Sequence, residues 1–130
     1  QLIDCGHMNE QQVRRARAAY QGKVNFIDEQ IGRVLNNLDN SPIGENCLRI
    51  YTSDHGEMAG EHGLWAKRSF REASSRVPLI LSWPKQMKGG RRASDIVSLI
   101  DIGPTLLDIA GAPPLPEADG TSFRPVMMGD

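Results

Sequence analysis

The chain has 130 residues, of which 39% are hydrophobic and 24% charged, a composition that excludes a disordered protein and predicts one modest hydrophobic core. Fifteen basic and sixteen acidic residues give a net charge of −1, which excludes the strongly basic surface that nonspecific binding to nucleic acid or an acidic membrane requires. No apolar run approaches the ~20 residues of a membrane-spanning helix, and the polar first ten residues do not have the pattern of a signal peptide. We therefore expect neither nucleic acid nor membrane as a partner.

Two cysteines, Cys5 and Cys47, lie in unlike contexts without the spacing of a zinc site or a disulfide framework, so they leave the cellular compartment open. From Asn9 to Leu38, apolar residues recur every three or four positions, which predicts one long amphipathic helix. Asn9 and Gln12 have the spacing of a capping box, so the helix should begin near residue 9 or 10.

Two short apolar runs follow, 47–52 and 77–83, and both are typical of strands. Between them, residues 53–76 are polar and glycine-containing, which indicates a long functional loop. The basic stretch Lys85 to Arg92 is typical of a solvated loop. Residues 101–111 have an acidic residue at the start, an early proline and a terminal glycine, which are the start and stop signals of a short helix. The tail from Ala112 should be irregular.

This order of elements predicts an α/β layer fold with a mostly parallel sheet flanked by helices. Only two strands are visible, and a two-stranded sheet is marginal alone. Either further strands escape the sequence pattern or the chain is part of something larger.

The first strand ends at Ser53-Asp54-His55-Gly56, at the kind of strand end where ligands gather in open α/β sheets. Asp54 offers a hard oxygen and His55 an imidazole nitrogen, which together suit a divalent cation. Two further chemistry-bearing residues, His62 and Lys67, follow within the same loop.

The segment TSDHGEMAGEHGLWAKRSFREASSRVPLILSWP, residues 52–84, closely resembles the sulfatase family of the alkaline-phosphatase superfamily. It is most similar to the members that carry Asp-His-Gly followed by Gly-Glu-His-Gly and a lysine, such as iduronate and choline sulfatases. The flanking segments 18–38 and 97–127 are similar to the helix before, and the strand-helix-loop after, the family's metal-binding strand. The fold implied is part of an alkaline-phosphatase-like sandwich, and the substrate implied is a sulfated small molecule or glycan.

The resemblance implies that Asp54 and His55 bind a divalent cation, usually calcium in sulfatases and sometimes manganese or zinc in the related phosphonate hydrolases. Lys67 matches the lysine that contacts the sulfate or phosphate oxygens, where an ammonium would neutralise charge in the transition state. His62 has three open roles: a residue that orients a metal ligand, a proton donor near the leaving group, or a residue that orders the loop. Glu57 and Glu61 are interpreted as loop caps or ion-pair partners.

Sulfatases use a cysteine or serine in a Cys/Ser-x-Pro-x-Arg motif, converted to the formylglycine nucleophile, and this chain has no such motif. Residues 1–130 are therefore interpreted as a single fragment of a sulfatase catalytic domain without its nucleophile-bearing part, inactive when isolated. Two alternatives stay open: a phosphonate or phosphate ester hydrolase of the same superfamily, and a non-catalytic binding domain. We expect Asp54, His55 and Lys67 to converge on one pocket, and the isolated chain to self-associate through apolar surface left exposed.

Overall fold

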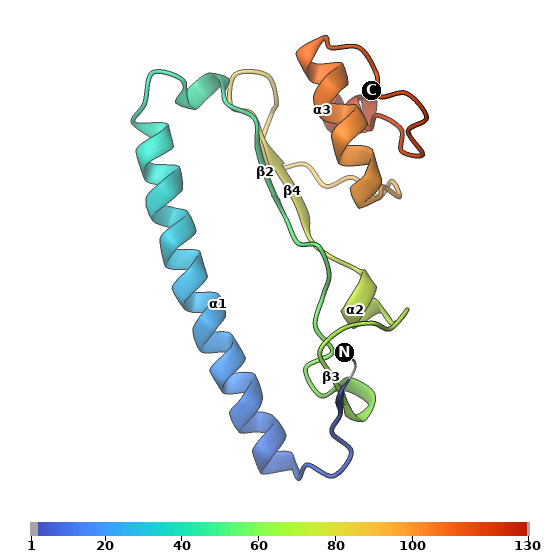
Figure 1. The fold of residues 1–130 in the computed structure, drawn as a ribbon. Helices are drawn as coiled ribbons and strands as arrows, with labels where there is room; N and C mark the ends of the chain where they lie inside the picture. Colours follow the sequence, from blue (N-terminus) through green and yellow to red (C-terminus); the bar gives the residue numbers. More distant parts are fainter. Residues whose placement is uncertain (1–2, 130) are drawn as a thin grey trace.

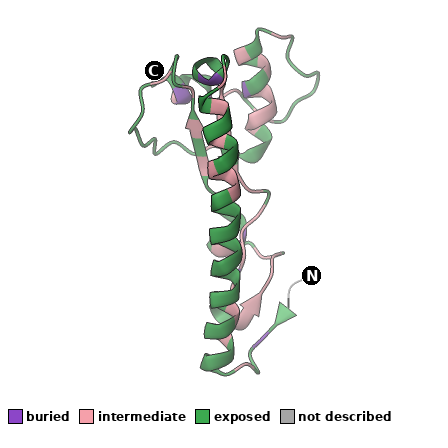
Figure 2. Cartoon of the chain, turned by 90° about the vertical axis from the view of Figure 1, so that its left-hand side faces the viewer, coloured by how far each residue is buried: buried purple, intermediate pink, exposed green. Residues whose placement is uncertain are grey.

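The computed structural model describes residues 3–129, which form a long helix, a β-hairpin and a small helical unit. The helix α1 spans Glu10–Asp39, and its first turn has the predicted capping box, in which Asn9 and Gln12 bond reciprocally to each other's backbone N–H groups. Figure 1 shows α1 running beside the hairpin but apart from it. No residue of α1 is buried: in the cartoon of Figure 2 the helix is mostly green, for exposed residues, with pink segments for intermediate ones.

The hairpin consists of β2, Arg49–Thr52, and β4, Leu79–Ser82, which pair antiparallel. The predicted parallel pairing is therefore wrong for these two strands. The two strands pair antiparallel because residues 53–76 connect them as a loop that reverses the chain direction. A parallel pair would need a crossover connection, usually a long helix, and these residues contain none. The α/β class itself is confirmed.

Two elements form a second small sheet that the sequence did not predict: β1, Ile3–Asp4, pairs antiparallel with β3, Leu64–Trp65. The loop between β2 and β4 also contains a 3-10 turn, η2, at Glu61–Gly63, and the short helix α2, Glu72–Ser75. A further 3-10 turn, η1, at Gly44–Asn46 connects α1 to β2.

The C-terminal unit contains η3, Leu99–Asp101, α3, Ile102–Ala110, and α4, Arg124–Met128. As predicted, α3 ends at a glycine in the left-handed region, Gly111 with φ 64°. The carboxylate of Asp101 does not cap α3; it accepts hydrogen bonds from the backbone N–H groups of Ser98 and Thr121 instead. The expectation of an irregular tail is wrong for α4.

The buried side chains form two small groups instead of the single core that the composition predicts. Among residues 3–129 the buried hydrophobic side chains are Cys5, Met58, Phe123 and Met127. The first two lie around the loop after β2, and the last two lie in the C-terminal unit with Thr105, whose hydroxyl accepts a hydrogen bond from the Phe123 N–H. None of the helices in the described part of the chain combines the length and apolar character needed to cross a membrane.

Candidate active site in the loop after β2

The end of β2 delivers Asp54 and His55 into a tight turn. The Ser53 hydroxyl donates to the His55 carbonyl oxygen at 2.8 Å, and the Gly56 N–H donates to the Ser74 carbonyl oxygen at 2.8 Å. This second bond brings the turn against the backbone of α2. A Cβ on Gly56 would lie 2.1 Å from the Ala73 carbonyl oxygen, so this approach requires glycine.

Asp54, His55 and Lys67 converge on one place. The Lys67 Nζ lies 2.5 Å from the His55 Nε2, and an Asp54 carboxylate oxygen lies 3.4 Å from the same nitrogen. The Asp54 side chain is 82% exposed, so this group is open on one side to further ligands. The three side chains that the sequence pattern singled out therefore share one site.

The ring of His55 is oriented by its other nitrogen. His55 Nδ1 lies 2.7 Å from the Gly56 carbonyl oxygen, which can only accept, so Nδ1 carries the proton and Nε2 presents a lone pair. A histidine that ligates a metal typically donates its second ring N–H to a backbone carbonyl in this way. The donor set, a carboxylate oxygen and an oriented imidazole nitrogen, therefore fits a divalent cation. Within residues 3–129, however, no three or more His, Cys, Asp and Glu side chains form a metal-binding cluster, so the pair is at most part of a complete ligand set.

The segment that carries Lys67 is folded tightly on itself. The fully buried Met58 lies at its centre: its N–H donates to the Ala66 carbonyl oxygen at 2.9 Å, and its sulfur accepts from the Ser69 hydroxyl. Both neighbours of Lys67 have left-handed backbone, Ala66 with φ 69° and Arg68 with φ 75°. Such a conformation costs an L-residue about 1–2 kcal/mol, so other contacts must hold it.

The remaining candidate residues have simpler surroundings. His62 is exposed in η2 with left-handed φ 53°, and its side chain makes no hydrogen bond to any described residue, so its three possible roles stay predictions. The Glu57 carboxylate accepts from two backbone N–H groups, which confirms its interpretation as a loop cap. Arg76 pairs with Glu72 at 3.3 Å on the exposed surface of α2.

Sequence reasoning missed one anchor of this loop, Arg17 on α1. Its Nε donates to the Ala59 carbonyl oxygen at 2.7 Å, 42 residues away along the chain. Next to this bond, Gly60 lies against α1: a Cβ there would be 3.0 Å from the Val13 side chain and 3.2 Å from the Trp65 ring. An arginine on an amphipathic helix has no local signature of such a contact, so the sequence offered no signal for it.

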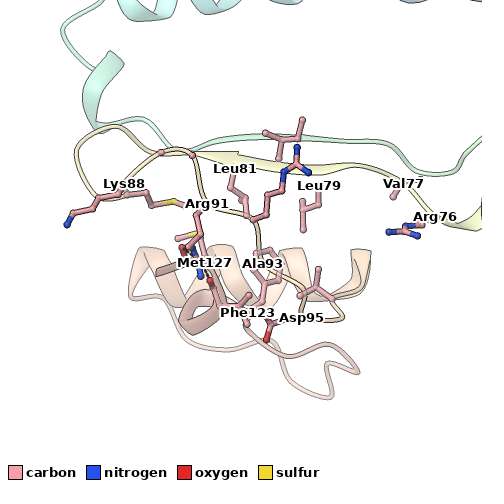
Figure 3. A pocket seen from close by; sticks show the side chains of 17 residues that line it. Arg76, Val77, Leu79, Leu81, Lys88, Arg91, Ala93, Asp95, Phe123 and Met127 are labelled. Carbon is pink, nitrogen blue, oxygen red and sulfur yellow. Dashed lines mark hydrogen bonds between the residues drawn. The ribbon is translucent and has the colours of Figure 1, made fainter. Parts of the chain in front are cut away.

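A cavity of about 540 Å³ lies elsewhere, between β4 and the C-terminal unit. Figure 3 shows Leu79 and Leu81 of β4 facing Phe123 and Met127 across it. Arg91 lies at one side and donates to the carbonyl oxygens of Val126 and Met127 at the end of α4. None of Asp54, His55 and Lys67 lines this cavity.

Fold and site together define an α/β protein segment with a carboxylate, an oriented imidazole and an ammonium at the end of a strand. The sulfatase family model matches residues 4–112, and the chain belongs to the sulfatase family.

The relatives and solved structures that the chain matches include a choline-sulfatase and a phosphonate monoester hydrolase. The chain is 36% identical to choline-sulfatase from Rhizobium meliloti, over 98% of this chain and 26% of that protein. A protein solved in complex with its substrate, D-glucosamine-2-N,6-O-disulfate, matches over 81% of this chain and 21% of its own chain, with TM-score 0.77 and 41% identity. The phosphonate monoester hydrolase of Agrobacterium radiobacter matches 93% of this chain and 24% of its own, with TM-score 0.87 and 34% identity. The chain thus spans about a quarter of the length of the proteins it matches.

Proposed function

We propose that this chain is part of a sulfuric ester hydrolase and contributes a metal- and sulfate-binding corner of its active site. The single observation that carries the proposal is the convergence of Asp54, His55 and Lys67, with the lysine ammonium and an aspartate oxygen both next to the His55 Nε2. A carboxylate, an imidazole and an ammonium within such distances suit a site that holds a cation and an anion together. The family membership supports the same reading.

In this proposal Asp54 and His55 hold a divalent cation, calcium in the first place and manganese or zinc as alternatives. The cation supplies electrostatic stabilisation of negative charge on the reacting ester. The Gly56 carbonyl oxygen keeps the His55 proton on Nδ1, so that Nε2 would offer its lone pair to the cation once the Lys67 ammonium, 2.5 Å away in this structure, turns to the sulfate oxygens. Lys67 places its ammonium against the sulfate oxygens, where it compensates charge that builds up as the ester bond breaks.

The rest of the site must come from outside these residues. The formylglycine nucleophile and the further metal ligands belong to the part of the catalytic domain that we propose to be absent from this chain. The same part completes a mostly parallel sheet, because β2 has a partner strand only on its β4 side within the described residues. Its docking also covers the apolar side chains of α1 that are exposed here, Tyr20, Val24, Phe26, Ile27 and Val34.

The test is hydrolysis of 4-nitrophenyl sulfate by the full-length protein that contains this chain, with and without divalent cation. Lys67→Ala should lower kcat/KM by about 10²–10³-fold, the range for loss of one group that stabilises transition-state charge. The matched control is Lys85→Ala, because Lys85 is an exposed lysine outside the loop of residues 53–76. Equal activity of wild type and Lys67→Ala would contradict the proposal.

Phosphonate or phosphate ester hydrolysis is the second candidate, favoured by the structural match to a phosphonate monoester hydrolase. Parallel assays with 4-nitrophenyl sulfate and 4-nitrophenyl phenylphosphonate distinguish the two candidate functions. A higher kcat/KM for the sulfate favours the sulfatase, and a higher kcat/KM for the phosphonate favours the phosphonate hydrolase. A sulfated sugar, free or as part of a glycan, is the substrate class that we propose first, because a matched structure holds a disulfated glucosamine. If neither ester is hydrolysed, the non-catalytic alternative gains support.

A further inference from the structure

Lys67 lies in a backbone segment that L-residues do not adopt readily. The residues on both sides of it, Ala66 and Arg68, have φ of 69° and 75°, and Ala59 on the facing part of the loop has φ 47°. Each of these three residues has a Cβ that disfavours the left-handed region. The direction in which Lys67 leaves the backbone therefore depends on contacts that hold this arrangement.

Glu57 supplies contacts of this kind from the opposite side of the loop. One carboxylate oxygen, Oε1, accepts from the Ala66 N–H at 2.5 Å and from the Ala59 N–H at 3.2 Å. It thus joins two of the left-handed residues of the loop, Ala59 and Ala66, at a single atom. The side chain is half-buried, and hydrogen bonds to an ionised acceptor are roughly twice as strong as neutral ones.

The residue after Glu57 in the chain is Met58, which lies at the centre of the folded loop. The N–H of the fully buried Met58 donates to the Ala66 carbonyl oxygen at 2.9 Å. Both the N–H and the C=O of Ala66 are therefore bonded to the pair Glu57-Met58. Ala66 is fixed at both polar groups, and Lys67 follows it directly in the chain.

We propose that Glu57 is a positioning residue for Lys67: its carboxylate holds the Ala66 backbone so that the lysine ammonium stays beside His55. The inference rests on the proposed function, in which that ammonium binds the sulfate oxygens. Glu57 itself acts through Lys67 and touches neither ester nor cation.

A double-mutant cycle in the full-length protein tests this inference with 4-nitrophenyl sulfate as the probe. Glu57→Ala should lower kcat by about 10²-fold, the cost of a misplacement near 1 Å in an active site. In a Lys67→Ala background the same substitution should lower kcat by no more than about threefold, because the group that it positions is already gone. Glu57→Gln keeps an acceptor oxygen and should retain activity within about tenfold of wild type.

Glu61→Ala is the matched control, since Glu61 is an exposed glutamate of the same loop whose side chain bonds to no described residue. It should leave kcat unchanged. If Glu57 served the stability of the fold alone, Glu57→Ala would lower kcat by the same factor in both backgrounds, and that result would overturn the proposal.

A crystal structure of Glu57→Gln and Glu57→Ala gives a readout that does not depend on turnover. We expect the Lys67 ammonium to remain within hydrogen-bond distance of His55 in Glu57→Gln and to leave it in Glu57→Ala. An unmoved lysine in Glu57→Ala would refute the positioning role even if the protein hydrolyses sulfate esters. Absence of hydrolysis by the wild type, with the lysine displaced in Glu57→Ala, would refute the proposed function and leave the positioning role intact.

Discussion

Replacing Gly56 by alanine should disturb the candidate site from within its own backbone. The added Cβ would lie 2.1 Å from the Ala73 carbonyl oxygen and 3.0 Å from the Ala73 carbonyl carbon, so the turn and α2 must separate by about 1 Å to restore van der Waals contact. That separation breaks or lengthens the 2.8 Å bond from the Gly56 N–H to the Ser74 carbonyl oxygen. Overpacking and the weakened bond together should lower the free energy of unfolding by about 2–4 kcal/mol.

The same movement reaches His55, because the Gly56 carbonyl oxygen accepts the bond from its Nδ1. In the proposed function His55 ligates a cation, and loss of an outer partner of such a histidine typically weakens metal binding by about 10–100-fold. Urea unfolding measures the stability of the full-length Gly56→Ala protein, and calorimetric titration of the metal-free protein with Ca²⁺ or Mn²⁺ measures the affinity.

Gly89→Ala is the control for Gly56→Ala, since a Cβ at Gly89 meets no atom of residues 3–129 within 4 Å. It should change neither stability nor metal affinity by more than the error of measurement. A Gly56→Ala protein as stable as wild type, with the same cation affinity, would refute the reasoning about both the close approach and the orientation of His55.

Two further predictions concern the C-terminal unit and the exposed faces. The pKa of Asp101 is lowered from 3.8, chiefly by the hydrogen bond from the Thr121 N–H and then by that from the Ser98 N–H. The ionised Asp101 carboxylate therefore stabilises the fold above pH 3.8, and this stabilisation is lost as the pH falls through the lower pKa of the folded state. The difference in thermal midpoint between wild type and Asp101→Asn should accordingly be largest near neutral pH and shrink below pH 3.8, and a difference independent of pH would contradict this assignment. The isolated 130-residue chain should elute as a dimer or larger species in size-exclusion chromatography with light scattering. The reason is that apolar residues of α1 such as Phe26 and Val34 are 64% and 65% exposed. A monomer at micromolar concentration would show that this surface does not self-associate.

Features with a local physical cause could be predicted from the sequence. The α1 boundary follows from the Asn9–Gln12 capping box, and the end of α3 follows from Gly111, since each depends on residues within one turn. The location of the candidate site could also be predicted, because only Ser53 separates Asp54 and His55 from the end of a strand and Lys67 belongs to a recognisable motif. The distances between these three side chains could not be derived from their spacing in the sequence, because the distances depend on how the loop of residues 56–66 folds.

Features that depend on distant partners were missed or wrong. The antiparallel register of β2 with β4 depends on the path of residues 53–76, which apolar periodicity does not encode. The helix α4 has only five residues, and its last carbonyls are bonded by Arg91, more than thirty positions earlier in the chain. Helices this short are marginal on propensity alone, so the sequence pattern carries no signal for α4.

The site and the scaffold differ in how much of their order this chain supplies. The polar groups around His55 and Lys67 find their partners within residues 53–76, with one addition from Arg17 of α1. The apolar surfaces of α1 and of the hairpin do not find theirs, and residues such as Tyr51 and Ile80 stay about half exposed. Substitutions within the loop should therefore act on the geometry of the three side chains, with an added loss of stability where they disturb close packing, as at Gly56. Substitutions on α1 should act mainly on assembly with the proposed remainder of the catalytic domain. Gly56 and Glu57 belong to the first group, which is why their variants are informative about chemistry.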